Sequence, residues 1–241
     1  MEYPIYAILV LVGIGAGFVQ RVSGFGLGIF AMIFLPHFMS SHTDAVVIVS
    51  IFSCVTSTWN AVRYGTHVAF KTVLPMVCAA LISIPLAVRF SAVVPGNIFE
   101  ILLGAVLIAL SLYFMLLNKR IRMKPTVTNG VFAGALSGVL SGLFSTGGPP
   151  AVLYLNSATE DNITYFATIQ FYFCFTNLYA TAVRAANGII HADLLLLAAV
   201  GAIGCMVGDA IGKTVFDKLD SDKLRRVIYG GMLISGIVTL L

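Results

Sequence analysis

Long stretches without a charged residue constrain this chain more than any other feature. No Asp, Glu, Lys or Arg occurs between Lys124 and Glu160, or between Asp161 and Arg184. Such runs reach or exceed the roughly 17–25 residues that a helix needs to cross about 30 Å of hydrocarbon. Ile101–Leu110 is apolar throughout, whereas the strands of a membrane barrel alternate polar and apolar residues. The sequence therefore predicts an all-α polytopic membrane protein.

The overall composition agrees with burial in a lipid bilayer and narrows the function classes. Charged residues make up 10% of the chain and apolar residues 59%, whereas about a quarter of a soluble domain is charged. The basic residues are spread among the predicted loops, so we expect no nucleic acid partner. The start, MEYP, has no basic region before its apolar run, which argues against a cleavable signal. The four cysteines form no CxxC pair, and we expect neither a metal nor another cofactor.

The chain compares well with itself, which indicates an internal duplication. SGFGLG at Ser23–Gly28 and STGGPP at Ser145–Pro150 each follow an apolar segment with spaced glycines. AVR occurs at Ala61–Arg63 and again, at nearly the same separation, at Ala182–Arg184. The predicted units are a first transmembrane repeat at residues 1–118, a cytoplasmic linker at 119–126 and a second, inverted transmembrane repeat at 127–241.

Each predicted repeat holds five apolar segments. In the first repeat they are residues 4–20, 24–39, 45–62, 72–88 and 98–117. In the second they are residues 127–143, 148–158, 163–183, 193–212 and 224–241. Because five is odd, the second repeat enters the membrane from the opposite side, which predicts inverted repeats. This holds whether the first two segments of each half are full spans or a re-entrant hairpin, since three crossings are also odd.

The distribution of Lys and Arg predicts the orientation of the chain. With alternate loops assigned to two sides, Arg89 and Arg184 fall on one side and eleven basic residues on the other, and Arg21, between the first two segments, is not counted. Loops rich in Lys and Arg stay in the cytoplasm, so we predict that both termini lie outside and that the linker 119–124 is cytoplasmic. The eleven residues are Arg63, Lys71, Lys119, Arg120, Arg122, Lys124, Lys213, Lys218, Lys223, Arg225 and Arg226.

Two glycine-rich breaks, at Gln20–Gly28 and Ser141–Pro150, mark the predicted binding site. In inverted-repeat transporters the substrate binds near the midplane, where broken helices present free N–H groups and positive dipole ends. Proline suits the first turn of a helix, so we expect a helix to begin at Gly147–Pro150. A cavity lined by such N–H groups favours an anion. The candidate substrate-binding residues are Gln20, Arg21, Ser23, Gly24, Phe25, Gly26, Asn60, Ser145, Thr146, Gly147, Gly148, Pro149, Gln170 and Asn177.

Two charged residues within the apolar sequence each have two interpretations. Arg21 is costly in a membrane unless it meets water, a partner or a ligand. It either grips an oxyanion with its guanidinium fork or is a structurally paired arginine at a hairpin tip, and the sequence leaves both open. Asp209 lies one helical turn before Lys213. We interpret it mainly as half of a helical ion pair, with a proton-coupling carboxylate as the alternative.

Two segments carry a resemblance to a known family. GFVQRVSGFGLGIFAMIFLP (Gly17–Pro36) and GVLSGLFSTGGPPAVLYL (Gly138–Leu155) resemble the two signature segments of the sulfite exporter TauE/SafE family, also called the TSUP permeases. FATIQFYF (Phe166–Phe173) is similar to the stretch that follows the second signature in one branch of that family. The chain departs from the pattern at Gly26-Leu27-Gly28, where many members have consecutive glycines. The resemblance covers nearly the whole chain.

The resemblance implies a carrier of small sulfur-containing anions, such as sulfite, sulfonates or sulfoacetate, in a bacterial cytoplasmic membrane. We therefore expect a secondary transporter that works by alternating access, imports or exports its substrate, and draws on the proton gradient or on the substrate gradient alone. The chain has no nucleotide-binding loop, so we do not expect direct coupling to ATP. An anion channel of the same fold is the first alternative and an intramembrane enzyme, which we do not favour, is the second. A homodimer is left open.

Overall fold

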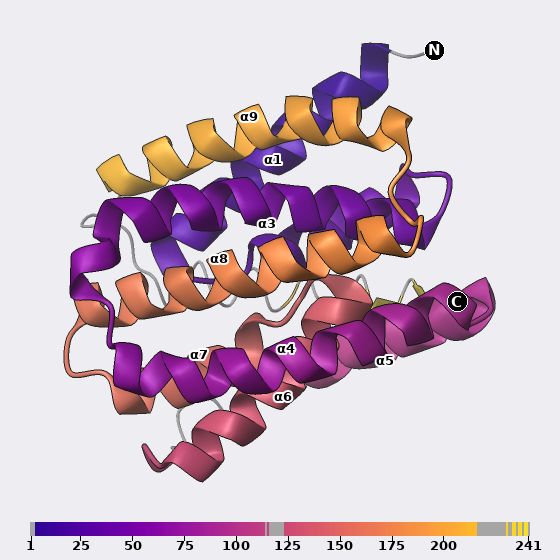
Figure 1. The fold of residues 1–241 in the computed structure, drawn as a ribbon. Coiled ribbons are helices and arrows are strands. Elements are labelled where there is room, and N and C mark those ends of the chain that lie inside the picture. Colours follow the sequence, from indigo (N-terminus) through magenta and orange to yellow (C-terminus); the bar gives the residue numbers. More distant parts are fainter. Residues whose placement is uncertain are drawn as a thin grey trace.

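The computed structural model describes residues 3–113, 115 and 123–215, and residues 230, 233–234, 236–237 and 239–240 near the end of the chain. Every secondary-structure element assigned within these residues is a helix (Figure 1). The longer ones are α1 (Tyr3–Ser23), α3 (His42–Tyr64), α4 (Phe70–Val93), α5 (Gly96–Leu112), α6 (Val127–Phe144), α8 (Asn162–Ala186) and α9 (Ala192–Val215). The shorter ones are α2 (Leu27–Phe34), α7 (Gly148–Ala158) and the 3-10 turns η1 (Leu35–His37) and η2 (Gly65–His67).

Five of these helices, α1, α3, α4, α6 and α9, are long and apolar enough to cross a membrane. By contrast, α2 has 8 residues and α7 has 11, which gives lengths of about 12 and 16 Å. Both are too short for about 30 Å of hydrocarbon, so they are half-helices that follow the two glycine-rich breaks. The chain is an all-α, multi-pass membrane protein with broken helices at its glycine signatures, as the sequence predicted.

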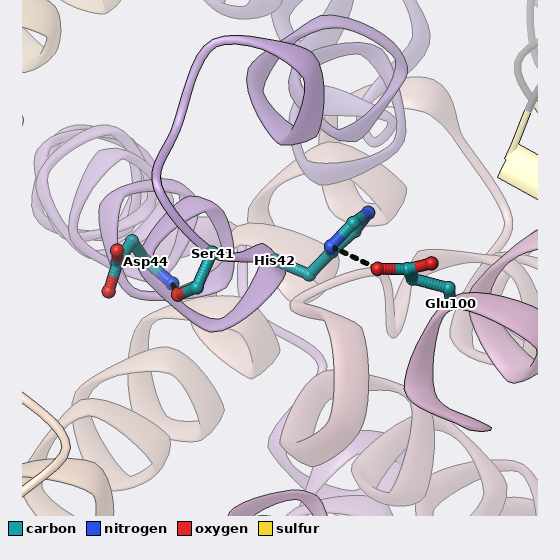
Figure 2. Close-up of polar contacts among 4 residues, drawn as sticks. All are labelled: Ser41, His42, Asp44 and Glu100. Carbon is teal, nitrogen blue, oxygen red and sulfur yellow. Dashed lines mark hydrogen bonds and ion pairs between the residues drawn. The ribbon is translucent and has the colours of Figure 1, made fainter. Parts of the chain in front are cut away.

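Side-chain caps fix the starts of the two central helices, α3 and α8. Ser41 Oγ accepts a hydrogen bond from the backbone N–H of Asp44 at 3.0 Å, at the start of α3 (Figure 2). In the same view, His42 Nδ1 lies 3.3 Å from Glu100 Oε1, which ties the start of α3 to α5. Asp161 caps the start of α8 in the same way. Its carboxylate accepts hydrogen bonds from the backbone N–H groups of Ile163 and Thr164 in the first turn of α8. The carboxylate is favoured there by the positive end of the helix dipole as well.

The packing between helices is matched between the two halves of the chain. The tightest pairs are α1 against α9 and α4 against α6, and α3 packs against α8 (Figure 1). If α1 to α4 correspond to α6 to α9, the pair α1–α9 maps onto α6–α4, and α3–α8 maps onto itself. A duplication with a two-fold relation predicts this pattern.

Glycines bring the members of the two outer pairs into backbone contact. A Cβ at Gly134 of α6 would lie 2.3 Å from the carbonyl oxygen of Met76 in α4. A Cβ at Gly208 of α9 would lie 2.0 Å from the carbonyl oxygen of Ile14 in α1. Small residues spaced by four allow helix backbones to approach closely in membranes, and both pairs use this device.

The central helices α3 and α8 run side by side in opposite directions (Figure 1). Ser50 Oγ lies 2.7 Å from Thr181 Oγ1, and Thr58 Oγ1 lies 3.4 Å from Cys174 Sγ. Residue numbers therefore rise along α3 as they fall along α8. Equivalent helices that run antiparallel are expected of inverted repeats.

Nine of the ten predicted apolar segments coincide with helices of the described part of the chain. The tenth, residues 224–241, lies mostly outside the described residues, and so do seven of the basic residues that set the predicted orientation: Lys119, Arg120, Arg122, Lys218, Lys223, Arg225 and Arg226. The sides of the termini, the linker and the repeat boundaries stay predictions. The assignment of Arg184 to an outer loop was wrong, because α8 continues to Ala186 and Arg184 is only 2% exposed.

Candidate functional site

The first break joins α1 to α2 through Gly24, Phe25 and Gly26. Gly24 and Gly26 have φ angles of 79° and 94°, a left-handed conformation that glycine adopts without a steric penalty. Gly26 directly precedes α2, and no side chain caps the start of that helix. The first N–H groups of α2, at Leu27 and Gly28, consequently have no partner within the helix.

The second break joins α6 to α7 and has a related geometry. Ser145, which ends α6, has a φ of 55° and is the one non-glycine residue with a positive φ in the described part of the chain. Its Oγ donates to the carbonyl oxygen of Val46 in α3 at 3.2 Å, which helps to hold this unfavourable conformation. Gly147 precedes α7, again without a side-chain cap, and proline occupies the first turn as predicted.

The two breaks touch and enclose one cavity. A Cβ at Gly28 would lie 2.0 Å from the carbonyl oxygen of Ser145, and one at Gly148 would lie 3.1 Å from Cδ2 of Phe25. The cavity has a volume of about 30 Å³, which is enough for one or two water molecules. It is lined by Gln20, Phe25, Gly26, Leu27, Gly28, Ile29, Ser53, Ser141, Ser145, Thr146, Gly147, Gly148, Phe173 and Asn177. We call it the central cavity.

The central cavity combines a positive potential with an unused hydrogen-bond donor. Both half-helices begin at it without caps, so their free N–H groups and dipole ends favour negative charge. Thr146 lines it and is 2% exposed, and its hydroxyl has no hydrogen-bond partner in the described part of the chain. Buried polar groups are nearly always hydrogen-bonded, so this hydroxyl is available to a ligand or to water.

Two glutamines tie the first break to the other half of the chain. Gln20 Nε2 donates to Gln170 Oε1 of α8 at 2.8 Å, and Gln170 Nε2 donates to the carbonyl oxygen of Gly24 at 3.0 Å. Thr56 Oγ1 of α3 lies 3.2 Å from Gln20 Oε1. Each break is thus fastened to the central helix of the opposite half, the first to α8 by Gln170 and the second to α3 by Ser145.

Arg21, Asn60 and Asp209 form a separate cluster. Arg21 Nη1 donates to Asn60 Oδ1 at 3.1 Å and Nη2 donates to Tyr64 OH at 2.5 Å. Asn60 Nδ2 in turn donates to Asp209 Oδ1 at 2.9 Å. The predicted ion pair between Asp209 and Lys213 is not found among the described residues. Asp209, 6% exposed, has the Asn60 amide as its partner instead.

The structure thus divides the predicted site residues into three groups. The residues that line the central cavity are Gln20, Phe25, Gly26, Ser145, Thr146, Gly147, Gly148 and Asn177. Those that support its wall by hydrogen bonds or by position in a break are Ser23, Gly24, Pro149 and Gln170. Those that lie in the separate cluster are Arg21, Asn60 and Asp209. No group of His, Cys, Asp or Glu in the described residues is arranged to hold a metal ion.

Sequence reasoning missed the buried role of Arg184. Its Nη2 donates to the carbonyl oxygens of Ser141 and Gly142 at 2.8 and 2.9 Å, and its Nη1 donates to Ser50 Oγ at 2.9 Å. These carbonyls belong to the last turn of α6, where a cation also meets the negative end of the helix dipole. The repeated AVR motif was the available signal, but its first copy ends in the exposed Arg63, which hid the difference.

Half-helices from two parts of the chain that meet at a small cavity are typical of multi-pass membrane proteins of the transporter class. The sequence profile described as Sulfite exporter TauE/SafE matches residues 9–239, and the chain belongs to this family. A relative from Cupriavidus necator, described as a probable sulfite/organosulfonate exporter TauE, is 22% identical over 234 residues, which cover 95% of this chain and 91% of the relative. No solved structure matches the chain.

Proposed function

We propose that this protein transports a small sulfur-containing oxyanion, such as sulfite or a short organosulfonate, across the bacterial cytoplasmic membrane. The observation that carries the proposal is the convergence of two uncapped helix starts and the unpaired Thr146 hydroxyl on the central cavity. Such a site favours an oxyanion over a cation or a neutral solute. The choice of sulfur rests on the family and on the relative from Cupriavidus necator, which is described as a probable sulfite/organosulfonate exporter.

Transport by alternating access would explain why the central cavity is small. A cavity of about 30 Å³ has room for one or two water molecules, so an oxyanion enters only if the two breaks move apart. Each break is hydrogen-bonded to the central helix of the other half. Rocking one half against the other would therefore widen the cavity on one side at a time.

Asp209 is the candidate for coupling transport to protons. It is 6% exposed and its carboxylate is hydrogen-bonded by Asn60, which itself accepts from Arg21. Among the described residues no cation bonds this carboxylate directly, and intramembrane carboxylates of this kind form the proton relays of transporters. If this group couples transport, Asp209→Asn abolishes the dependence of uptake on the pH gradient but leaves exchange of substrate for substrate.

The test is a flux measurement with purified protein in liposomes. Labelled sulfite and a two-carbon sulfonate are expected to accumulate, and flux is expected to rise when unlabelled substrate is present on the opposite side, as for a carrier. Electrical conductance without this trans-stimulation would identify an anion channel instead, and chemical conversion of the anion would identify an enzyme. If neither sulfur anion crosses faster than through empty liposomes, the proposal is refuted. Light scattering on the same preparation can measure whether the protein forms a homodimer.

A further inference from the structure

A hollow beside the central cavity has the features of a second anion site. It is lined by Arg21, Tyr64, Asn162, Ile163 and Phe166 and has a volume of about 260 Å³, which is many times that of the central cavity. It lies where α1 and α3 end and α8 begins. This is the side that the basic residues assign to the cytoplasm, since Arg63 lies in the last turn of α3 and Lys71 in the first turn of α4.

The Arg21 guanidinium in this hollow is fixed in place and still has free donors. Its Cζ lies 4.8 Å from the ring centroid of Phe166 and 5.1 Å from that of Tyr64, so two aromatic rings hold the planar group by cation–π contact. Two of its hydrogen bonds go to Asn60 and Tyr64, whereas an arginine has five N–H donors. In the described part of the chain the other three have no acceptor.

The charges around the hollow favour an anion. Arg63 adds a second cation, with its Cζ 5.9 Å from the Tyr64 ring centroid. None of the residues that line the hollow is acidic, and the carboxylates of Asp161 and Asp209 accept hydrogen bonds from the first N–H groups of α8 and from Asn60. A guanidinium with adjacent free N–H groups binds the paired oxygens of a sulfonate or sulfite in fork geometry.

We propose that this hollow is a second oxyanion site, in series with the central cavity. The anion binds there before it enters the central cavity. The two sites are neighbours along α1, because Gln20 lines the central cavity and Arg21 lines the hollow. In this conformation the hollow has room for an anion and the central cavity does not. The proposal rests on the proposed function, since it concerns the same substrate.

Calorimetric titration of the purified protein with sulfite and with methanesulfonate tests the proposal. We expect two anions per chain for the wild type. Arg21→Gln should weaken one binding event at least 10-fold and leave the other within about 3-fold, while Thr146→Val in the central cavity should do the reverse. Lys71→Gln, which removes an exposed charge on the same predicted side without touching the hollow, is the control and should bind two anions.

A second variant keeps the test decisive if Arg21→Gln fails to fold. Asn162→Asp places a negative charge in the wall of the hollow at an exposed helix start, where an acid is compatible with the helix, and it should weaken the same event at least 10-fold. If both variants still bind two anions, or if the wild type binds one anion that is sensitive only to Thr146→Val, the second site is refuted and the proposed function stands. If the wild type binds no sulfur anion, the proposed function fails as well.

The membrane itself offers an oxyanion of similar chemistry, the phosphate of a lipid headgroup. Titrations in nanodiscs of zwitterionic lipid and of anionic lipid separate the two sources. Persistence of the Arg21-dependent event in both supports a soluble substrate. Its suppression by anionic lipid alone would identify a headgroup as the occupant and overturn the assignment to transported substrate.

Discussion

Replacing Thr146 by valine should change stability and anion affinity in opposite directions. The substitution removes a hydroxyl and keeps the shape of the side chain. In the absence of a ligand this hydroxyl is 2% exposed and has no hydrogen-bond partner in the described residues. A threonine whose hydroxyl already makes a hydrogen bond would behave differently. Its replacement by valine removes that bond, so it would not stabilise the protein.

The expected magnitudes follow from the burial of the hydroxyl. An unsatisfied buried polar group costs about 1–3 kcal/mol, and the lower end applies because the central cavity has room for a water molecule that can bond Thr146. A gain of about 1 kcal/mol corresponds to a rise in Tm of roughly 2–4 °C for a chain of this size. A hydrogen bond to an anion is worth about 1.5–3 kcal/mol, so Thr146→Val should weaken anion binding by about 10- to 150-fold.

The assay combines thermal unfolding of the purified protein, with and without sulfite, and equilibrium binding. Thr176→Val is the matched control, because Thr176 is fully buried in α8 and its Oγ1 already donates to the carbonyl of Tyr172 at 2.9 Å. The control should unfold at the same temperature as the wild type or below it, and should bind anions as the wild type does. If Thr146→Val behaves like Thr176→Val in both measurements, the hydroxyl is not a ligand for the substrate and the reasoning about the central cavity is wrong.

Three further predictions concern the frame that holds the site. Gly134→Ala should lower the unfolding temperature by several degrees, because its Cβ would meet the Met76 backbone and overpacking costs about 1–3 kcal/mol; Gly96→Ala, with open space around it, is the control and should be neutral. Arg184→Gln should destabilise the protein by about 2–4 kcal/mol in thermal unfolding, since three acceptors lose a charged donor, and Arg184→Lys should recover only part, because it lacks the planar fork. Hydrogen bonds from Thr164 and Ile163 hold the pKa of Asp161 below its usual value. The Asp161 carboxylate therefore stabilises the fold fully above about pH 4, and this stabilisation is lost as the pH falls through the lowered pKa. A series of unfolding temperatures at different pH values should show this loss in the wild type and not in Asp161→Asn.

The sequence predicted the fold well because lipid enforces it locally. Charge-free runs, glycine signatures and the Pro149 turn each report on a few consecutive residues, and the half-helices α2 and α7 begin where these signals placed them. The meeting of the two breaks was also predictable, because the predicted inverted duplication brings them together. The partner of Asp209 could not be predicted in this way. The spacing of four residues suggested Lys213, whereas the actual partner is the amide of Asn60, which lies on another helix.

The arginines were harder to predict because the duplication does not extend to them. Arg63 and Arg184 occupy equivalent places in the AVR motif, yet Arg63 is exposed and Arg184 is fully buried. The difference arises from what lies opposite each residue, namely the carbonyls at the end of α6 for Arg184. Such partners are fixed only by the packing of distant segments, which no local pattern reports.

This departure from symmetry has a consequence for the proposed transport cycle. Opening the central cavity at the Arg184 end separates α8 from the end of α6, which breaks hydrogen bonds of a buried guanidinium to Ser141 and Gly142. At the other end, Arg21 is already partly exposed in a hollow of about 260 Å³, and the buried Asp209 accepts from the Asn60 amide, so opening there breaks no hydrogen bond of a buried guanidinium. Two conformations related by the inverted repeats would have equal energy only if both ends were alike. In the alternating-access cycle proposed above, Arg184 therefore favours the state open on the Arg21 side, and substrate bound in the central cavity would have to supply the free energy that releases Arg184.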